Sequence, residues 1–281
     1  AFHTLWTKPF FALRPPPFYL DDWDILTTML SALEWRKHNG GIKMITDSAG
    51  AEYYRKLGID HIWNLGMETL LETAIGNAIR PLPFWAAGKI YALRSMSAPC
   101  AMIDTDFIIW KPVKALVENA PLSVIHREKI SDAIYPPKTF FAMDDGYTFP
   151  ETWDWSAEPC NTAFLFINDG ELKSYYTEQS INFMKNLKQS RDITAEMVFA
   201  EQRLLAMCCR EKNIAINAIL DGGSLENQRM FTHVWGLKNV LKESVKTNRE
   251  FCVNCAARIL TDFPEEKTTL ENIAALQPYW F

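Results

Sequence analysis

The first 112 residues alternate between short apolar runs and longer amphipathic stretches, and this alternation most limits the folds open to the chain. The longer stretches repeat apolar residues at helical spacing, as Trp23, Leu26 and Leu33 do. Strands that alternate with helices predict parallel strands joined by right-handed crossovers. We therefore expect an α/β fold with a Rossmann-like, mainly parallel sheet flanked by helices. The expected strands are residues 2–6, 42–45, 59–63 and 100–103, and the expected helices are residues 22–39, 49–57, 68–80 and 84–96.

Two aspartates, Asp104 and Asp106, directly follow the apolar run 100–103 and precede another apolar run, 107–110. In an extended chain residues i and i+2 point to the same face, so both carboxylates are expected on one side. Two like charges this close repel unless a cation lies between them. Carboxylate oxygens suit Mg²⁺ or Mn²⁺, and ligands of open α/β sheets bind at the carboxyl ends of strands. The alternative is a solvated turn, because Asp-x-Asp is a short motif.

The second half of the sequence continues as the same domain. Strands are expected at residues 122–125, 160–168 and 214–220, and helices at 171–188 and 192–212, followed by two short terminal helices. Residues 127–160 carry few helix signals and many aromatic side chains, which is typical of a substrate loop and equally of a poorly packed insertion. We expect a single domain over residues 1–281, with a nucleotide-binding half at 1–112 and an acceptor and sugar half at 113–281.

The composition excludes several classes of partner. A net charge of −5 and a pI near 5.6 provide no basic field for a nucleic acid backbone, although an isolated nucleotide needs only one cation and a few donors. No apolar run reaches the length of about 18 residues that a transmembrane helix requires. The six scattered cysteines do not form a disulfide pattern, and this indicates ordinary thiols in a reducing cytoplasm.

Three segments occur in a familiar order: Asp104-Thr-Asp106, Asn161-Thr-Ala163, and His233-Val-Trp-Gly236-Leu-Lys238. With these segments the chain resembles metal-dependent glycosyltransferases of the GT-A fold, nearest to the retaining glycogenin-like and lipopolysaccharide-galactosyltransferase-like group. The resemblance implies a nucleotide-sugar donor, such as a UDP-sugar, and a glycan or other hydroxyl acceptor. It also implies that Asp104, Asp106 and His233 hold Mn²⁺, with Mg²⁺ as the alternative. Two carboxylates with an imidazole favour Mn²⁺ on ligand grounds too.

The resemblance also implies further site residues. Donor-binding roles fall on Trp6, Thr7, Asp47, Lys89, Asn161 and Lys238, and catalytic roles fall on Glu201 and Gln202. Two positions depart from the family pattern: Lys238 stands one residue early, and Thr162-Ala163 replaces a pair of smaller residues. Each of these side chains also has a purely structural interpretation, such as a buried histidine at position 233 or a solvated lysine at position 89.

The implied mechanism is transfer with retention, in which Glu201 or Gln202 stabilises positive charge at the sugar carbon. An inverting enzyme would instead need a carboxylate base, for which Glu158 and Asp154 are candidates. A non-catalytic nucleotide- or sugar-binding protein of the same fold is an alternative interpretation. A metal-dependent phosphoesterase is a further one, but such enzymes normally gather more histidine and carboxylate ligands than this triad.

Overall fold

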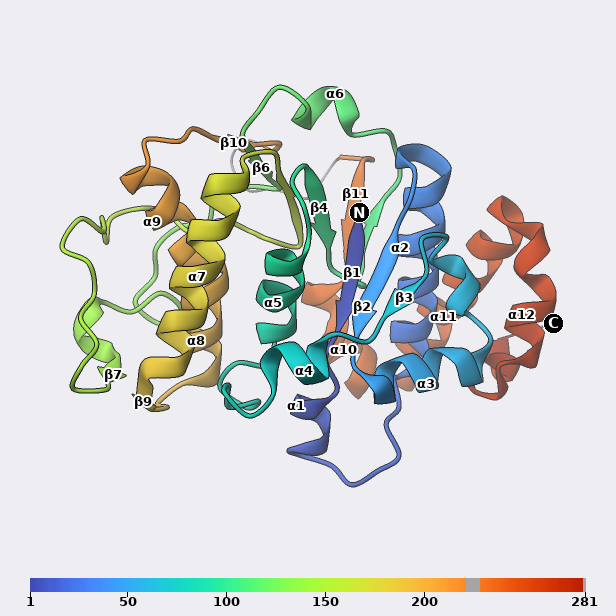
Figure 1. Cartoon of the computed structure of the whole chain (residues 1–281). Helices are drawn as coiled ribbons and strands as arrows, with labels where there is room; N and C mark the ends of the chain where they lie inside the picture. Colours follow the sequence, from blue (N-terminus) through green and yellow to red (C-terminus); the bar gives the residue numbers. More distant parts are fainter. Residues whose placement is uncertain (221–227, 280–281) are drawn as a thin grey trace.

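A computed structural model describes residues 1–220 and 228–279, and their largest sheet has seven strands in the order β10-β6-β8-β4-β1-β2-β3 (Figure 1). The strand β8 runs antiparallel to both of its neighbours, β4 and β6, and the other pairs are parallel. The expected α/β fold with a mixed, mainly parallel sheet is therefore confirmed. The strands are β1 Phe2–Leu5, β2 Lys43–Thr46, β3 Met67–Glu68, β4 Cys100–Ile103, β6 Leu122–Val124, β8 Phe164–Ile167 and β10 Ile216–Ala218.

Helices cover both faces of this sheet, and the side chains of β4 show how the two layers form. Cys100 and Met102 belong to one hydrophobic cluster, while Ala101 and Ile103 belong to the other, as alternation along a strand requires. The first cluster contains α5 (Ala87–Ser95), α7 (Gly170–Asn186) and α9 (Leu204–Glu211). The second contains α2 (Asp22–Asn39), α3 (Ser48–Leu57) and α11 (Val245–Asp262) (Figure 1). Within residues 1–220 and 228–279, no helix has both the length and the hydropathy that a bilayer crossing needs.

The carboxyl ends of β1, β2 and β4 meet at one edge of the sheet, the lower edge in Figure 1. The short helices α1 (Lys8–Phe11), α4 (Leu71–Ile75) and α10 (Lys238–Glu243) lie near this edge. A separate antiparallel pair, β5 (Phe107–Ile109) with β11 (Phe231–His233), leads away from it. This edge is where the sequence predicted a ligand.

Some expected elements are absent from their predicted places. Residues 59–63 do not form a strand but contain a 3₁₀ turn, Asp60–Ile62, and the third strand lies further on, at β3. Ile59, Ile62 and Trp63 recur at the i, i+3, i+4 spacing of a helical turn, which explains why all three are buried. Of the helix expected at residues 68–80, only α4 forms. Two short helices were expected near the C-terminus, but the structure has the 18-residue α11 followed by α12 (Lys267–Asn272).

The helix expected at residues 192–212 contains a π-helical segment, Phe199–Arg203, between α8 (Ile193–Val198) and α9. Such a segment leaves backbone carbonyls without their usual helical partners. Here Ser180 donates its hydroxyl to the carbonyl of Ala200 at 2.8 Å, and Tyr176 donates to that of Glu201 at 2.5 Å. Both hydroxyls come from α7, so α7 holds the π segment in place.

The contact between α2 and α11 contains a buried carboxyl pair, Glu34 and Asp262. Burial, and then the neighbouring Asp262, raise the pKa of Glu34 to about 7. Asp262 keeps its charge because Nε of Arg258 lies 2.5 Å from its Oδ2 and Nζ of Lys37 lies 3.8 Å away. Nε2 of His38 lies 3.3 Å from Oε2 of Glu34, but within the described residues no hydrogen bond reaches either oxygen of Glu34 unless Glu34 itself carries a proton. We infer that the proton resides on Glu34.

Replacing Glu34 by Gln is expected to stabilise the protein at pH 8 but not at pH 4.5. A carboxyl group whose pKa is raised on folding contributes fully below its unfolded pKa, and the contribution is lost as pH rises through the folded pKa of about 7. Each unit of that shift corresponds to about 1.4 kcal/mol, so the advantage of Glu34→Gln should reach about 3 kcal/mol at pH 8. Urea unfolding at both pH values measures it. An equal difference at the two pH values would contradict the raised pKa of Glu34.

Candidate functional site

Asp104 and Asp106 lie at the carboxyl end of β4, and a tight turn between them brings their carboxylates together. The amide of Phe107 donates to the carbonyl of Asp104 at 3.0 Å, so the chain turns back instead of continuing as a strand. The two carboxylates do lie together, as expected, but a turn brings them together and not the alternation of side chains along a strand. The amide of Asp104 donates to the carbonyl of Ala163 at 2.8 Å, which anchors the turn to the chain just before β8.

His233 reaches the two aspartates through the pairing of β11 with β5. In this register His233 lies opposite Phe107, and the amide of Val234 donates to the carbonyl of Asp106 at 3.0 Å. Ligand atoms of Asp104, Asp106 and His233 all lie within 4.8 Å of one another. The structure thus gathers the three side chains that the sequence suggested as metal ligands, although His233 follows the two aspartates by more than a hundred residues.

The protonation states of this triad suit a cation. Burial lowers the pKa of His233 to about 4, so its imidazole is neutral at pH 7 and has a free lone pair. Burial opposes the charge on Asp106, but Lys238 outweighs it and holds the pKa of Asp106 below its usual range. Burial raises the pKa of Asp104 to about 7, even though Lys89 acts in the opposite direction. The triad therefore offers at least one carboxylate and a neutral nitrogen at neutral pH.

The donor set passes a simple test of fit for a divalent cation. Carboxylate oxygens with one imidazole nitrogen are suitable ligands for Mn²⁺, and oxygen ligands also suit Mg²⁺. Oδ2 of Asp106 is buried and lies 2.8 Å from Nζ of Lys238 and 3.9 Å from Nε2 of His233. A cation bound by this oxygen would compete with the ammonium group of Lys238, which is one-third exposed and can turn away. Asp104, Asp106 and His233 can therefore hold such an ion.

Lys89 extends from α5 and bridges two carboxylates. Its Nζ lies 2.6 Å from Oδ1 of Asp104 and also contacts Oε1 of Glu201, and the opposing carboxylates raise its pKa despite burial. Thr162 donates to the same oxygen of Glu201 at 2.8 Å. The helix can approach β1 this closely because Gly88 has no side chain: a Cβ there would lie 2.9 Å from Cβ of Trp6.

Lys238 is the first residue of α10. It pairs with Asp106, whereas Lys89 pairs with Asp104 and Glu201. Its Nζ is 2.8 Å from Oδ2 of Asp106 and 5.8 Å from the ring centroid of Trp23. Asp24, on the first turn of α2, also acts on this ammonium. Burial raises the pKa of Asp24 to about 7. The sequence offered no sign of Asp24, because the turn of α2 carries several acidic residues that look like ordinary helix-terminal charges.

Gln202 follows Glu201 in the π segment, but it faces a different partner. Its amide oxygen accepts a hydrogen bond from the hydroxyl of Tyr135 at 2.6 Å. The next residue, Arg203, is buried and donates to the carbonyls of Tyr135 and Pro136, each at 2.8 Å, and to that of Trp155. The long irregular segment 127–160 is thus fastened to the helix that carries Glu201 and Gln202.

Trp6, Thr7 and Asp47 lie at the ends of β1 and β2. Both the amide and the hydroxyl of Thr7 donate to Oδ2 of Asp47, at 2.8 and 2.9 Å, and Oδ1 accepts from the amide of Gly50. Asp47 therefore caps α3 and fixes the end of β1, and both of its oxygens are engaged. Trp6 is 7% exposed, and its indole N–H has no partner among the described residues. Of these three, Trp6 has the free donor.

Asn161 contacts a carboxylate that sequence reasoning missed. Its Nδ2 donates to Oε1 of Glu128 at 3.0 Å, and its Oδ1 accepts from the amide of Ala163 at 3.2 Å. Nε2 of His126 lies 2.9 Å from the same Oε1 of Glu128. A signal was present: His126 and Glu128 follow β6 at i and i+2, just as the aspartates follow β4.

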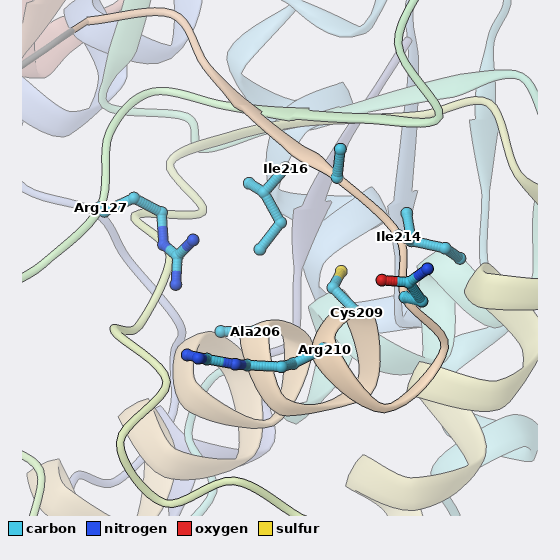
Figure 2. Close-up of a pocket in the computed structure, with 8 residues that line it drawn as sticks. Arg127, Ala206, Cys209, Arg210, Ile214 and Ile216 are labelled. Carbon is cyan, nitrogen blue, oxygen red and sulfur yellow. The ribbon is translucent and has the colours of Figure 1, made fainter.

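The two candidates for an inverting base lie elsewhere. Asp154 pairs with Arg210 at 2.9 Å and accepts from Ser156, while the Glu158 side chain is exposed and its carbonyl accepts from Arg127. Arg127 and Arg210 line a cavity of about 360 Å³ between α9 and β10, with both guanidinium groups on one side (Figure 2). None of the predicted site residues lines this cavity.

Comparisons with known proteins complete the description. The sequence pattern of a family described as "Family of unknown function (DUF6734)" matches residues 2–273. A search of curated proteins finds no match. Among solved structures, the apo form of mouse xyloside xylosyltransferase 1 superposes with a TM-score of 0.41 and 8% identity, covering 77% of this chain and 83% of that one. Likeness at this level carries no argument about activity, so any function has to be argued from the site itself.

Proposed function

We propose that this chain, which belongs to the family of unknown function DUF6734, is a metal-dependent glycosyltransferase of the GT-A type. It would move a sugar from a nucleoside diphosphate donor to a hydroxyl group of a glycan or another acceptor. The observation that carries the proposal is the convergence of Asp104, Asp106 and His233 at the carboxyl edge of the sheet. Ligands of open α/β sheets bind at this edge.

The residues around the triad suit a leaving diphosphate. A divalent cation, when bound by Asp104, Asp106 and His233, would neutralise charge on the phosphate oxygens as the bond to the sugar breaks. Lys238, an ammonium group at the same carboxylate, would bind the phosphates directly. It is one-third exposed and can move away from Asp106 towards an anion. Positive groups placed where negative charge develops are among the strongest contributions to catalysis.

Glu201 and Gln202 would have different roles, because their surroundings differ. Glu201 is 3% exposed, and its Oε1 contacts both Lys89 and Thr162, so it would fix the position of Lys89 beside the sugar. Gln202 is only partly buried, and Tyr135 occupies its amide oxygen. Gln202 would therefore present its NH₂ group to the substrate. Lys89 and Thr162 engage Glu201, so Glu201 is not free to act as a base, and this supports transfer with retention.

The chain would divide the donor between its two halves. The base and ribose would lie over β1 and β2 in residues 1–112, where Trp6 has an unused N–H donor. The diphosphate would lie at the triad after β4. The sugar would lie over β8 and β6 in residues 113–281, because these strands are the next ones on that side.

A thermal-shift screen of UDP, GDP, CDP and their common sugar conjugates, with and without Mn²⁺, tests the proposal. A ligand at about 100 times its Kd stabilises a folded protein by about 2.7 kcal/mol, which is a shift of several degrees at this size. We expect one nucleotide series to raise the melting temperature, and only with Mn²⁺. Slow Mn²⁺-dependent donor hydrolysis would then separate a transferase from a non-catalytic binding protein. Hydrolysis of simple phosphate esters instead would favour the phosphoesterase.

A further inference from the structure

The carboxylate of Glu128 is held in place by two donors on one oxygen. Nε2 of His126 and Nδ2 of Asn161 lie 2.9 and 3.0 Å from Oε1. Within the described part of the chain nothing donates a hydrogen bond to the second oxygen, Oε2. The side chain is 32% exposed, so Oε2 is accessible to a ligand. A positioned carboxylate oxygen with free lone pairs is a strong acceptor for hydroxyl groups.

The backbone places this carboxylate beside the metal triad. The segment just before β8 is hydrogen-bonded on both sides. On one side the amide of Asp104, at the end of β4, donates to the carbonyl of Ala163, and on the other side the segment pairs with the chain that follows β6. On that second side, the amide of Asn161 donates to the carbonyl of His126 at 2.9 Å, and the amide of Glu128 donates to the carbonyl of Pro159 at 2.8 Å. The three strand ends are therefore neighbours at one edge. The hydrogen bond from His126 lowers the pKa of Glu128.

Alternation along the extended segment 126–128 directs the side chains. His126 and Glu128 point to one face, and Arg127, between them, points to the other, where it lines the cavity of Figure 2. Glu128 thus belongs to the triad side of this segment. The amide group of Asn161 donates one N–H to Glu128 and accepts from Ala163, which fixes the orientation of the side chain and leaves one N–H unused.

We propose that Glu128 is the residue that binds the sugar of the donor, with Oε2 accepting hydrogen bonds from the sugar hydroxyl groups. His126 and Asn161 are positioning residues, which fix Oε1 and thereby aim Oε2. This proposal rests on the proposed glycosyltransferase function, and it gives Asn161 a supporting role in place of direct contact with the sugar. It also assigns a preference: the site recognises a sugar with adjacent free hydroxyl groups on the side of β6.

Glu128→Gln tests the assignment sharply, because His126 and Asn161 would keep an oxygen at the Oε1 position. The amide NH₂ would then replace Oε2, so an acceptor becomes a donor. Isothermal titration with Mn²⁺ should compare UDP, GDP and CDP with their glucose, galactose and mannose conjugates. We expect affinity for the sugar conjugate to fall by about tenfold or more, because hydrogen bonds to charged groups are the strong ones. Affinity for the free diphosphate should stay within about twofold.

The control is Glu118→Gln, which changes an exposed surface carboxylate and should leave both affinities unchanged. In the described part of the chain this carboxylate pairs only with Lys114. Glu128→Asp keeps the charge but shortens the side chain, and should give an intermediate, equally selective loss. It also serves if Glu128→Gln does not fold. Equal losses for diphosphate and conjugate, or no loss for either, would overturn the role of Glu128 while leaving the glycosyltransferase proposal intact. A wild-type protein that binds none of the diphosphates would overturn both.

Discussion

Replacing Asp106 by Asn is expected to abolish Mn²⁺-dependent binding of the nucleoside diphosphate while leaving the fold intact. The substitution keeps the shape of the side chain but removes the charge that a divalent cation needs. Loss of a partner outside the ligand set already costs about 10–100-fold in metal affinity, so loss of a carboxylate ligand should cost at least about 100-fold. Titration calorimetry with Mn²⁺ and the nucleotide found by the screen measures this effect.

The stability of Asp106→Asn should change little, and this separates a metal site from a structural ion pair. Asp106 is 5% exposed, but its partner Lys238 is one-third exposed and can turn towards water when the charge is lost. Asp145→Asn is the matched control, because Asp145 is 95% exposed and, among the described residues, pairs only with Lys188. Unchanged nucleotide affinity in Asp106→Asn would contradict the metal site. A large fall in melting temperature with intact binding would instead make Asp106 a structural residue.

Replacing Lys89 by Met is expected to destabilise the protein more than any surface substitution. Lys89 is the positive charge between Asp104 and Glu201, and removing it leaves the half-buried carboxylate of Asp104 facing the buried carboxylate of Glu201. Removing one partner of a buried ion pair typically costs about 3–5 kcal/mol. Urea unfolding at pH 7.5 measures the free energy of unfolding. The control Lys56→Met alters an exposed lysine that pairs with Glu52, and should change it by less than about 0.5 kcal/mol.

A double variant shows whether repulsion between Asp104 and Glu201 causes the loss of stability in Lys89→Met. In Lys89→Met with Glu201→Gln, one of the two opposing charges is gone, so part of the stability should return. Simple loss of packing around the lysine stem predicts that the two effects add. A Lys89→Met variant as stable as the Lys56→Met control would show that the two carboxylates tolerate each other without the ammonium group.

Local pattern was enough to place the elements that lead to the site. The apolar run before Asp104 and Asp106 predicted β4, and the helical stripe from Trp23 predicted α2 with its correct ends. These features depend on residues near in sequence, where periodicity and turn residues carry the information. The strand at 59–63 was predicted wrongly because a short apolar run can equally well be a buried helical turn.

The rest of the site depends on pairings between distant segments, which no local pattern contains. His233 lies beside Asp106 only because β11 pairs with β5, and its assignment came from a family resemblance. Glu128 was missed because the sequence does not show that β8 runs antiparallel to β4 and β6. In this arrangement the residues at the start of β8 lie next to the ends of β4 and β6, and Asn161 comes close to Glu128. The π segment was missed because it needs Ser180 and Tyr176 from another helix to satisfy its carbonyls.

The π segment has a consequence for how sequences of this family should be compared. One added residue inside a helix rotates every later side chain by about 100° around the axis, whereas an added residue in a loop only lengthens the loop. Glu201 and Gln202 lie within this segment, and α9, whose residues 204–209 are buried, follows it directly. A gap placed here in an alignment would therefore imply a turned helix with a repacked core. Relatives that share this site should align through residues 193–211 without insertion or deletion.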